Sequence, residues 1–218
     1  MKARLTALFV LATACLFQVF PADPKEGALK AFEERQAKAV KDLKVKAEAG
    51  DAKAQAGLGF HYDMGIGVAE DRREAAKWYR KAAEQGHTRA QYLLGEMYSS
   101  GSGVVKDDAE AVKWFRKAAE QGLADAQLNL GNKYFDGNGV AKDEAEAVKW
   151  FRKAAEQGLA EAQFNLALKF DVGSGVTKDE REAVKWYRKA AEQGLAEAQV
   201  NLGTLFWLGN GVVKDESE

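Results

Sequence analysis

Pairs of carboxylates recur along the chain three residues apart, and paired carboxylates are a common basis of acid–base catalysis. The pairs are Asp71/Glu74, Asp107/Glu110, Asp143/Glu146 and Asp179/Glu182. Each pair stands where a helix is expected to begin. With Asp at the N-cap and Glu at the third helical position, the spacing is that of a capping box. We therefore interpret these carboxylates as helix starts and not as an active site.

Paired glycines of the form G-x-G-V raise the possibility of phosphate binding. The pairs are Gly65/Gly67, Gly101/Gly103, Gly137/Gly139, Gly173/Gly175 and Gly209/Gly211. They lack the G-x-G-x-x-G spacing and follow expected helices instead of strands, so a turn that needs positive φ explains them better.

Histidine and cysteine offer little material for catalysis or metal binding. The chain has two histidines, His61 and His87, which occupy different repeat positions, and one cysteine, Cys15. A single cysteine excludes an intrachain disulfide and a thiolate cluster, and no Ser-His-Asp or Cys-His set can be assembled. No catalytic residue, metal site or cofactor is predicted.

Composition narrows the class of protein. The 218 residues carry a formal net charge of -1, with 30% charged and 46% hydrophobic residues. These values exclude a disordered chain and a polytopic membrane protein. Because opposite charges are interspersed, a nucleic-acid partner is not expected either.

The sequence segments that contain these residues repeat with a period of 36 residues. Trp78, Trp114, Trp150 and Trp186 keep this interval, and so do the glycines listed above. We divide the chain into repeats at 51–86, 87–122, 123–158 and 159–194, with a partial repeat at 195–218.

Each repeat predicts two helices. Ala126, Leu130 and Tyr134 form an apolar stripe on the first, and Gly131 beside it suggests that a neighbouring helix approaches closely. The second begins at the Asp N-cap and ends at a glycine such as Gly122, followed by Leu123 as in a Schellman motif. The tryptophans share one register and are expected to pack in the core.

Both ends of the array differ from the repeats. Residues 23–50 predict an N-terminal capping helix that starts at Asp23-Pro24 and has Asp42 where the repeats have Trp. At the other end the sequence stops inside a fifth capping box, Asp215 to Glu218, so the last repeat looks truncated. We expect its first helix to expose apolar side chains such as Trp207, unless something else covers them. End-to-end self-association is one way to cover them.

Residues 1–22 predict a secretory signal peptide. Lys2 and Arg4 precede an apolar run from Leu5 to Phe20, which is too short to span a membrane. Cleavage after Ala22 fits best, although acylation of Cys15 as a lipoprotein and an uncleaved anchor remain alternatives. Since the mature chain has no N-x-S/T sequon and no cysteine, bacterial export to the periplasm or the medium is favoured.

The repeat resembles the Sel-1-like repeat, a relative of the tetratricopeptide repeat. The matching residues of one copy are Ala90, Leu94, Gly95, Tyr98, Gly101, Gly103, Val104, Asp107, Ala111, Trp114, Ala118, Ala119 and Gly122. Departures are small: Ala167 replaces Gly, and Phe170 and Phe206 replace Tyr. The resemblance implies an all-α, right-handed α/α superhelix that assembles other proteins. Cysteine-rich members bind or hydrolyse β-lactams, but their paired cysteines are missing here.

The side of the first helices opposite the apolar stripe varies between copies, and the resemblance places these helices on the concave side. We predict that it contacts a protein or peptide partner through Lys53, Phe60, Arg89, Leu93, Glu96, Asp125, Asn129, Asn132, Glu161, Asn165, Leu168, Glu197, Asn201 and Thr204. Asn129, Asn165 and Asn201 are expected to hydrogen-bond an extended peptide backbone. The third repeat position changes from basic to acidic along the array and predicts a groove with electrostatic polarity. Plain solvent exposure with neutral drift is the competing interpretation.

The sequence therefore predicts an exported, non-enzymatic scaffold that binds a polypeptide on its concave face. A secreted β-lactam-binding or β-lactam-hydrolysing protein is the first alternative, by analogy with the family alone. A host-directed effector or adhesin is the second.

Overall fold

The computed structural model describes residues 24–209, which form ten α-helices and contain no strand. The helices are α2 (Pro24–Glu48), α3 (Ala52–Met64), α4 (Arg72–Glu84), α5 (Thr88–Ser100), α6 (Asp108–Glu120), α7 (Ala124–Asp136), α8 (Glu144–Glu156), α9 (Ala160–Val172), α10 (Glu180–Glu192) and α11 (Ala196–Leu208). The expected signal segment, Asp23 and the fifth capping box lie outside these residues.

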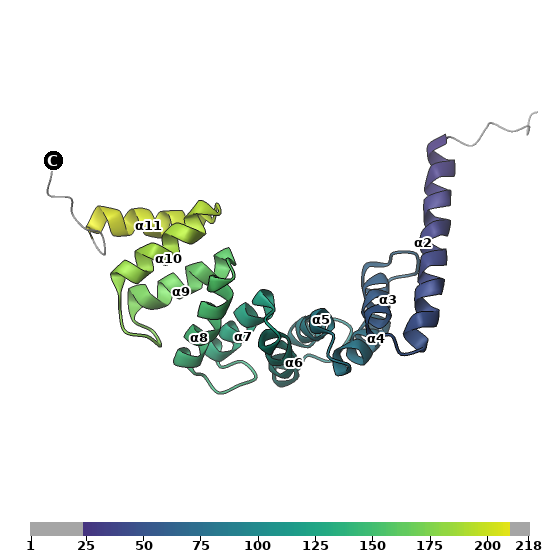
Figure 1. Ribbon diagram of the computed structural model, residues 1–218, viewed down its shortest axis with the longest axis horizontal. Helices are drawn as coiled ribbons and strands as arrows, with labels where there is room; N and C mark the ends of the chain where they lie inside the picture. Colours follow the sequence, from purple (N-terminus) through teal and green to yellow (C-terminus); the bar gives the residue numbers. More distant parts are fainter. Residues whose placement is uncertain (1–23, 210–218) are drawn as a thin grey trace, which may run out of the picture.

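The helices follow one another along an arc with α2 at one end and α11 at the other (Figure 1). Each odd-numbered helix from α3 to α9 packs on the helix that follows it, and the resulting hairpins stack in sequence. Around the middle of the arc, α5 lies on the concave side of α6 (Figure 1). The predicted all-α solenoid of repeated helix pairs is confirmed.

The two glycines of each turn have different roles. Gly137 ends α7 in the left-handed region at φ 75°, as its C-cap position requires. Gly139 also has positive φ, and in addition a Cβ at this position would lie 2.1 Å from the carbonyl oxygen of Asp108. Asp108 is the first residue of α6 in the preceding repeat, so the turn rests directly on the neighbouring repeat.

The starts of the second helices are capped by aspartate, as predicted, but the capping box is only half formed. The Asp143 carboxylate accepts a hydrogen bond of 2.9 Å from the Glu146 amide. The amide of Asp143, however, donates to the carbonyl of Tyr134 at 2.9 Å, and the Glu146 side chain contacts Lys149 at 2.7 Å. Tyr134 lies in the last turn of α7, where carbonyls lack partners within their own helix. The expected return bond from glutamate is therefore replaced by a bond between the two helices of one repeat.

The ends of the second helices match the Schellman prediction. Gly122 has a φ of 90°, and the amide of Leu123 donates to the carbonyl of Ala118 at 3.2 Å. Both features recur in the next copies, so this turn joins one repeat to the next in the same way each time.

Small residues on the first helices allow an aromatic ring to approach. A Cβ at Gly95 would lie 2.7 Å from the ring of Phe115, and one at Gly131 would lie 2.6 Å from Phe151. Both rings are 1% exposed. The predicted close neighbour is therefore the aromatic residue that follows the tryptophan in the same repeat.

The tryptophans are buried, as expected. Trp114 is 3% exposed, and the Lys117 ammonium lies 4.4 Å from the centroid of its ring. The same Trp–Lys arrangement recurs at Trp78, Trp150 and Trp186. The lysine stems thus cover the outer edge of the core while their charges stay in water.

A buried glutamine joins each repeat to the preceding helix, and a second glutamine of the same repeat bonds it; neither was anticipated from the sequence. Gln127 is 4% exposed; it donates to the carbonyl of Ala119 in the preceding repeat at 3.1 Å and accepts from Gln157 at 2.8 Å. The same two bonds are made by Gln55 with Gln85, by Gln91 with Gln121, and by Gln163 with Gln193. Each buried side-chain amide therefore donates across a repeat boundary and accepts within its own repeat.

The two end helices differ from the rest. α2 has 25 residues and packs on α3 through Val40 and Ala47, so it occupies the place of a second helix in front of the first repeat. Gln36 of α2 aligns with Arg72 of α4, and α2 begins a further twelve residues earlier. On α11, Trp207 is 86% exposed.

Candidate functional site

The fourteen residues predicted to contact a partner all lie on the odd-numbered helices α3 to α11, and none of them is buried. We call this set of fourteen residues the inner strip. Their exposure is the minimum requirement for a binding face. Phe60, for example, leaves 46% of its surface exposed.

Contacts between neighbouring repeats join part of the inner strip into one surface. Arg89 pairs with Asp125 at 3.3 Å, and the Asn129 amide donates to Glu96 at 2.6 Å. One repeat further on, the Asn165 amide donates to the side-chain oxygen of Asn132 at 3.4 Å. These partners are 33 or 36 residues apart in the sequence, so α5, α7 and α9 present their side chains side by side.

The Arg89–Asp125 ion pair reduces the predicted change from basic to acidic charge along the groove. The basic and acidic stretches of the third repeat position meet at this pair, where the two charges neutralise each other. Their side chains are 56% and 46% exposed, so the pair adds at most about 1 kcal/mol of stability. The acidic stretch that remains consists of Glu161 and Glu197, both exposed.

Each of three asparagines of the inner strip already donates one side-chain hydrogen bond within the chain. Asn129 donates to Glu96 and Asn165 to Asn132, while Asn201 donates to the hydroxyl of Tyr187 at 3.1 Å. Their side-chain oxygens accept no hydrogen bond from the described part of the chain. Asn129, Asn165 and Asn201 therefore each keep an acceptor oxygen that can bond N–H or O–H donors of a partner.

A polar pocket of about 220 Å³ lies where α5 and α7 meet. Its lining residues are Glu96, Ser99, Phe115, Asn129, Asn132, Lys133, Asp136 and Asn138. Three of them belong to the predicted set, namely Glu96, Asn129 and Asn132. The other inner-strip residues do not line this pocket.

Lys133, which the sequence prediction missed, is tied to the wall of this pocket. Its ammonium lies 2.5 Å from the Asp108 carboxylate and 2.7 Å from the Ser99 hydroxyl. The hydrogen bond from Lys133 lowers the pKa of Asp108. Lys133 follows Asn132 and aligns with Lys169 and Met97 in neighbouring copies, so only the superhelical stacking shows what it contacts.

Glu96 carries a perturbed carboxyl group in this pocket. Partial burial raises its pKa, against the opposing effects of the hydrogen bond from Asn129 and the charge of Lys133. A carboxylate that lacks water and lacks a full ionic partner is the kind of group that gains from an incoming cation.

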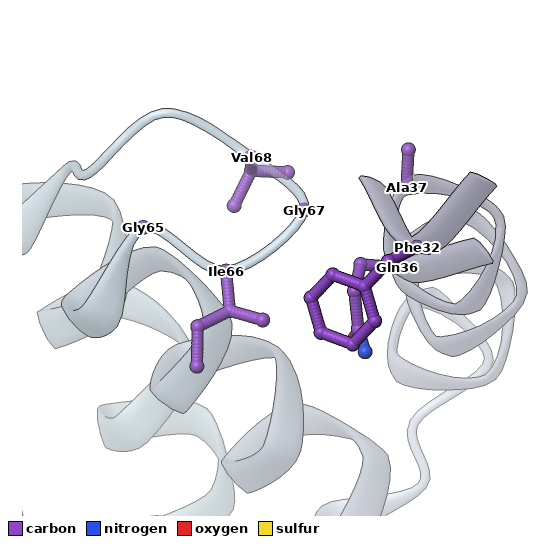
Figure 2. A pocket seen from close by; sticks show the side chains of 7 residues that line it. All are labelled: Phe32, Gln36, Ala37, Gly65, Ile66, Gly67 and Val68. Carbon is purple, nitrogen blue, oxygen red and sulfur yellow. The ribbon is translucent and has the colours of Figure 1, made fainter. Parts of the chain in front are cut away.

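An apolar pocket of about 520 Å³ lies between α2 and the turn that joins α3 to α4 (Figure 2). Figure 2 shows the Phe32 ring on the α2 side and the Ile66 side chain on the turn side. Phe32 lies on the part of α2 that extends beyond the length of the other second helices. Ile66 stands where the other copies have Ser102, Asn138 and Ser174, and this departure was the available sequence signal.

Both histidines make structural contacts. His61 Nδ1 lies 2.7 Å from the carbonyl oxygen of Ile66, and His87 Nδ1 accepts a 3.2 Å hydrogen bond from the amide of Ala90 as the N-cap of α5. Residues 24–209 contain no group of three or more His, Cys, Asp or Glu side chains placed to hold a metal ion. Nor does any helix in this range have the length and apolar character needed to cross a membrane.

Stacked helical hairpins with a continuous polar strip define an α/α repeat solenoid, a fold that serves as a scaffold for protein–protein interaction. The model of the Sel1 repeat matches residues 52–87, 88–123, 124–159, 160–195 and 196–218, so the chain belongs to the Sel1-repeat family. These repeats begin one residue later than the intervals taken from the 36-residue period.

Two solved structures are similar over most of the chain. One is a protective antigen of uropathogenic Escherichia coli with an SLR fold, at 49% identity and a TM-score of 0.77 over 79% of this chain. The chain spans only 37% of that antigen's length. The other is a Sel1 repeat protein from Oxalobacter formigenes, at 40% identity and a TM-score of 0.76, covering 84% of this chain and 72% of that one. A search of curated proteins found no match.

Proposed function

We propose that this chain is an exported, non-catalytic scaffold that binds an extended polypeptide along the inner strip. The observation that carries the proposal is the set of side-chain contacts that links α5, α7 and α9 through residues that differ between copies. The second helices, by contrast, repeat nearly the same sequence and provide a constant support. A surface whose residues vary on an unvarying support is suited to recognising one partner.

The form of the surface favours a polypeptide over a small molecule. The inner strip extends over five helices, which is a longer surface than one small molecule covers. Free acceptor oxygens spaced along the strip fit the donors of an extended backbone.

Export rests on the apolar run from Leu5 to Phe20, with its positive flank. The similar protein from uropathogenic E. coli is a protective antigen, which also favours a location outside the cytoplasm. An antibody-accessibility or fractionation experiment on cells that express the full chain tests this part separately.

The non-catalytic part of the proposal rests on how the candidate groups are used. The aspartates of the carboxylate pairs cap helices and the histidines contact backbone atoms. Ser99 lies beside the Lys133 amine, but that amine is held as an ammonium in an ion pair with Asp108 and so does not serve as a base. A nitrocefin assay on purified protein tests the β-lactamase alternative. We expect no turnover above the uncatalysed rate, and turnover would remove the non-enzymatic assignment.

Site-specific photo-crosslinking tests the binding face. A benzoylphenylalanine at Glu161 on the inner strip is compared with one at Glu156, an exposed residue of α8. In extracts of the native cells we expect a discrete adduct from position 161 and none from position 156. Equal labelling from both positions would refute the assignment of the binding face.

A further inference from the structure

We propose that the pocket between α5 and α7 takes the cationic side chain of a lysine or arginine in the bound polypeptide. This inference rests on the proposed function, since it names the chemistry of the partner that the inner strip binds. Glu96 and Asp136 provide the negative charge, and Asn129 supplies a neutral acceptor beside them.

The pocket has the size of one side chain. Its volume of about 220 Å³ corresponds to roughly seven water molecules at about 30 Å³ each. That space holds the outer methylenes and the head group of a lysine or arginine, while the peptide backbone stays on the strip.

The two carboxylates of the pocket have no ion-pair partner among the described residues, and the charge of Lys133 offsets only part of that of Glu96. Lys133 is the one cation of the lining, and its ammonium is held 2.5 Å from Asp108, outside the lining set. Neither Glu96 nor Asp136 forms an ion pair within residues 24–209. Two carboxylates therefore remain open to a cation that the chain does not provide.

The hydrogen-bonding groups of the pocket point to the same partner. Asn129 gives its amide hydrogen to Glu96 at 2.6 Å and keeps its oxygen for another donor. A guanidinium carries five N–H donors and an ammonium three, and neither has an acceptor. Such a head group can bond Glu96 and the Asn129 oxygen, whereas a carboxylate or phosphate would meet the like charges of Glu96 and Asp136.

The rest of the inner strip extends the same preference. Beyond the Arg89–Asp125 pair, the third repeat position is acidic at Glu161 and Glu197. Exposed carboxylates of this kind contribute little affinity each, but they attract basic segments at low ionic strength. We infer that the partner segment carries further basic residues on the side of the pocket that faces α9 and α11.

Two acetylated hexapeptide amides test the proposal, one alternating glycine with lysine and the other glycine with glutamine. Binding is measured on the full chain by isothermal titration and by the NMR shifts of the Asn129 and Asn132 side-chain amides. Because a charged hydrogen bond contributes about 1.5–3 kcal/mol, we expect the lysine peptide to bind at least about tenfold more tightly. That preference should shrink as salt rises from about 0.05 M to about 0.5 M.

Substitution of Glu96 tests whether the preference for the lysine peptide arises in this pocket. Glu96→Gln keeps an oxygen for the Asn129 amide and removes the charge, so we expect it to lose about tenfold affinity for the lysine peptide and none for the glutamine peptide. Glu156→Gln on α8 makes the same charge change away from the strip and should alter neither. Circular dichroism confirms that both variants are folded.

Three results overturn the cation pocket: equal affinity for the two peptides, an unchanged affinity in Glu96→Gln, or no binding of either peptide. The proposed function has its own readout in the crosslinking at Glu161 and Glu156. If Glu161 captures a partner segment without lysine or arginine, the pocket assignment is wrong and the binding face stands. If both positions crosslink equally, both proposals fall.

Discussion

Replacing Gly139 by alanine tests how the repeats are stacked. The new Cβ would lie 2.1 Å from the carbonyl oxygen of Asp108 and 2.2 Å from its carbonyl carbon, both backbone atoms that cannot rotate away. Gly122→Ala is the matched control. Gly122 also has positive φ, at 90°, but its added Cβ would meet nothing within 4 Å.

The difference between the two variants isolates the contact between repeats. A left-handed alanine costs about 1–2 kcal/mol, and we expect this loss in both. Forcing an atom into a packed seam costs about 1–3 kcal/mol more, in Gly139→Ala alone. At about 2–4 °C per kcal/mol for a chain of this size, its Tm should lie about 2–12 °C below that of the control.

Far-UV circular dichroism on heating measures both Tm values, and hydrogen exchange shows where stability is lost. We expect amides of α6 and α7 to lose protection first in Gly139→Ala, because repeat arrays lose stability locally. If Gly139→Ala and Gly122→Ala were equally stable, the turn would not bear on the preceding repeat, and the reasoning about stacking would be wrong.

Three further predictions concern single side chains. Gln127→Ala should lower the free energy of unfolding by about 1–3 kcal/mol in urea titrations, because it removes two hydrogen bonds of about 0.5–1.5 kcal/mol each, one donated to the Ala119 carbonyl and one accepted from Gln157; an unchanged value would show that these bonds add nothing. Burial raises the pKa of Glu96 in the folded chain, so the stability that it contributes is present at low pH and lost as pH rises through that pKa. Glu96→Gln should thus gain stability relative to the parent between about pH 4 and about pH 7, and a relative loss would contradict the sign. Exchanging the charges of Arg89 and Asp125 together should restore most of what either single reversal loses, within the 1 kcal/mol or so of an exposed pair; additive losses would mean that the two residues do not interact.

The sequence predicts the helices well because each boundary is encoded locally. Asp143 accepts from an amide three residues on, and Gly122 takes its left-handed turn without help from another repeat. The burial of Trp114 also follows from its period alone. Features that depend on the placement of a neighbouring helix were missed, such as the bond from the Asp143 amide to Tyr134.

The same distinction holds for the candidate site. The varying positions are exposed, as their place opposite the apolar stripe predicts, but their pairing could not be read from one helix at a time. Arg89 and Asp125 gave the expected groove its polarity, yet across the seam they neutralise each other. Lys133 was overlooked because its partner Asp108 belongs to another repeat and 25 residues separate the two.

The contacts between neighbouring repeats recur at a fixed spacing in the sequence. Gln127 bonds Ala119 eight residues before it and Arg89 bonds Asp125 36 residues after it, both across a repeat boundary, so each bond depends only on the offset between adjoining units. Unequal recombination that inserts or removes one whole unit in the gene would rebuild an identical junction. The reach of the binding surface can thereby grow or shrink in constant steps over evolution, without a new fold having to be found.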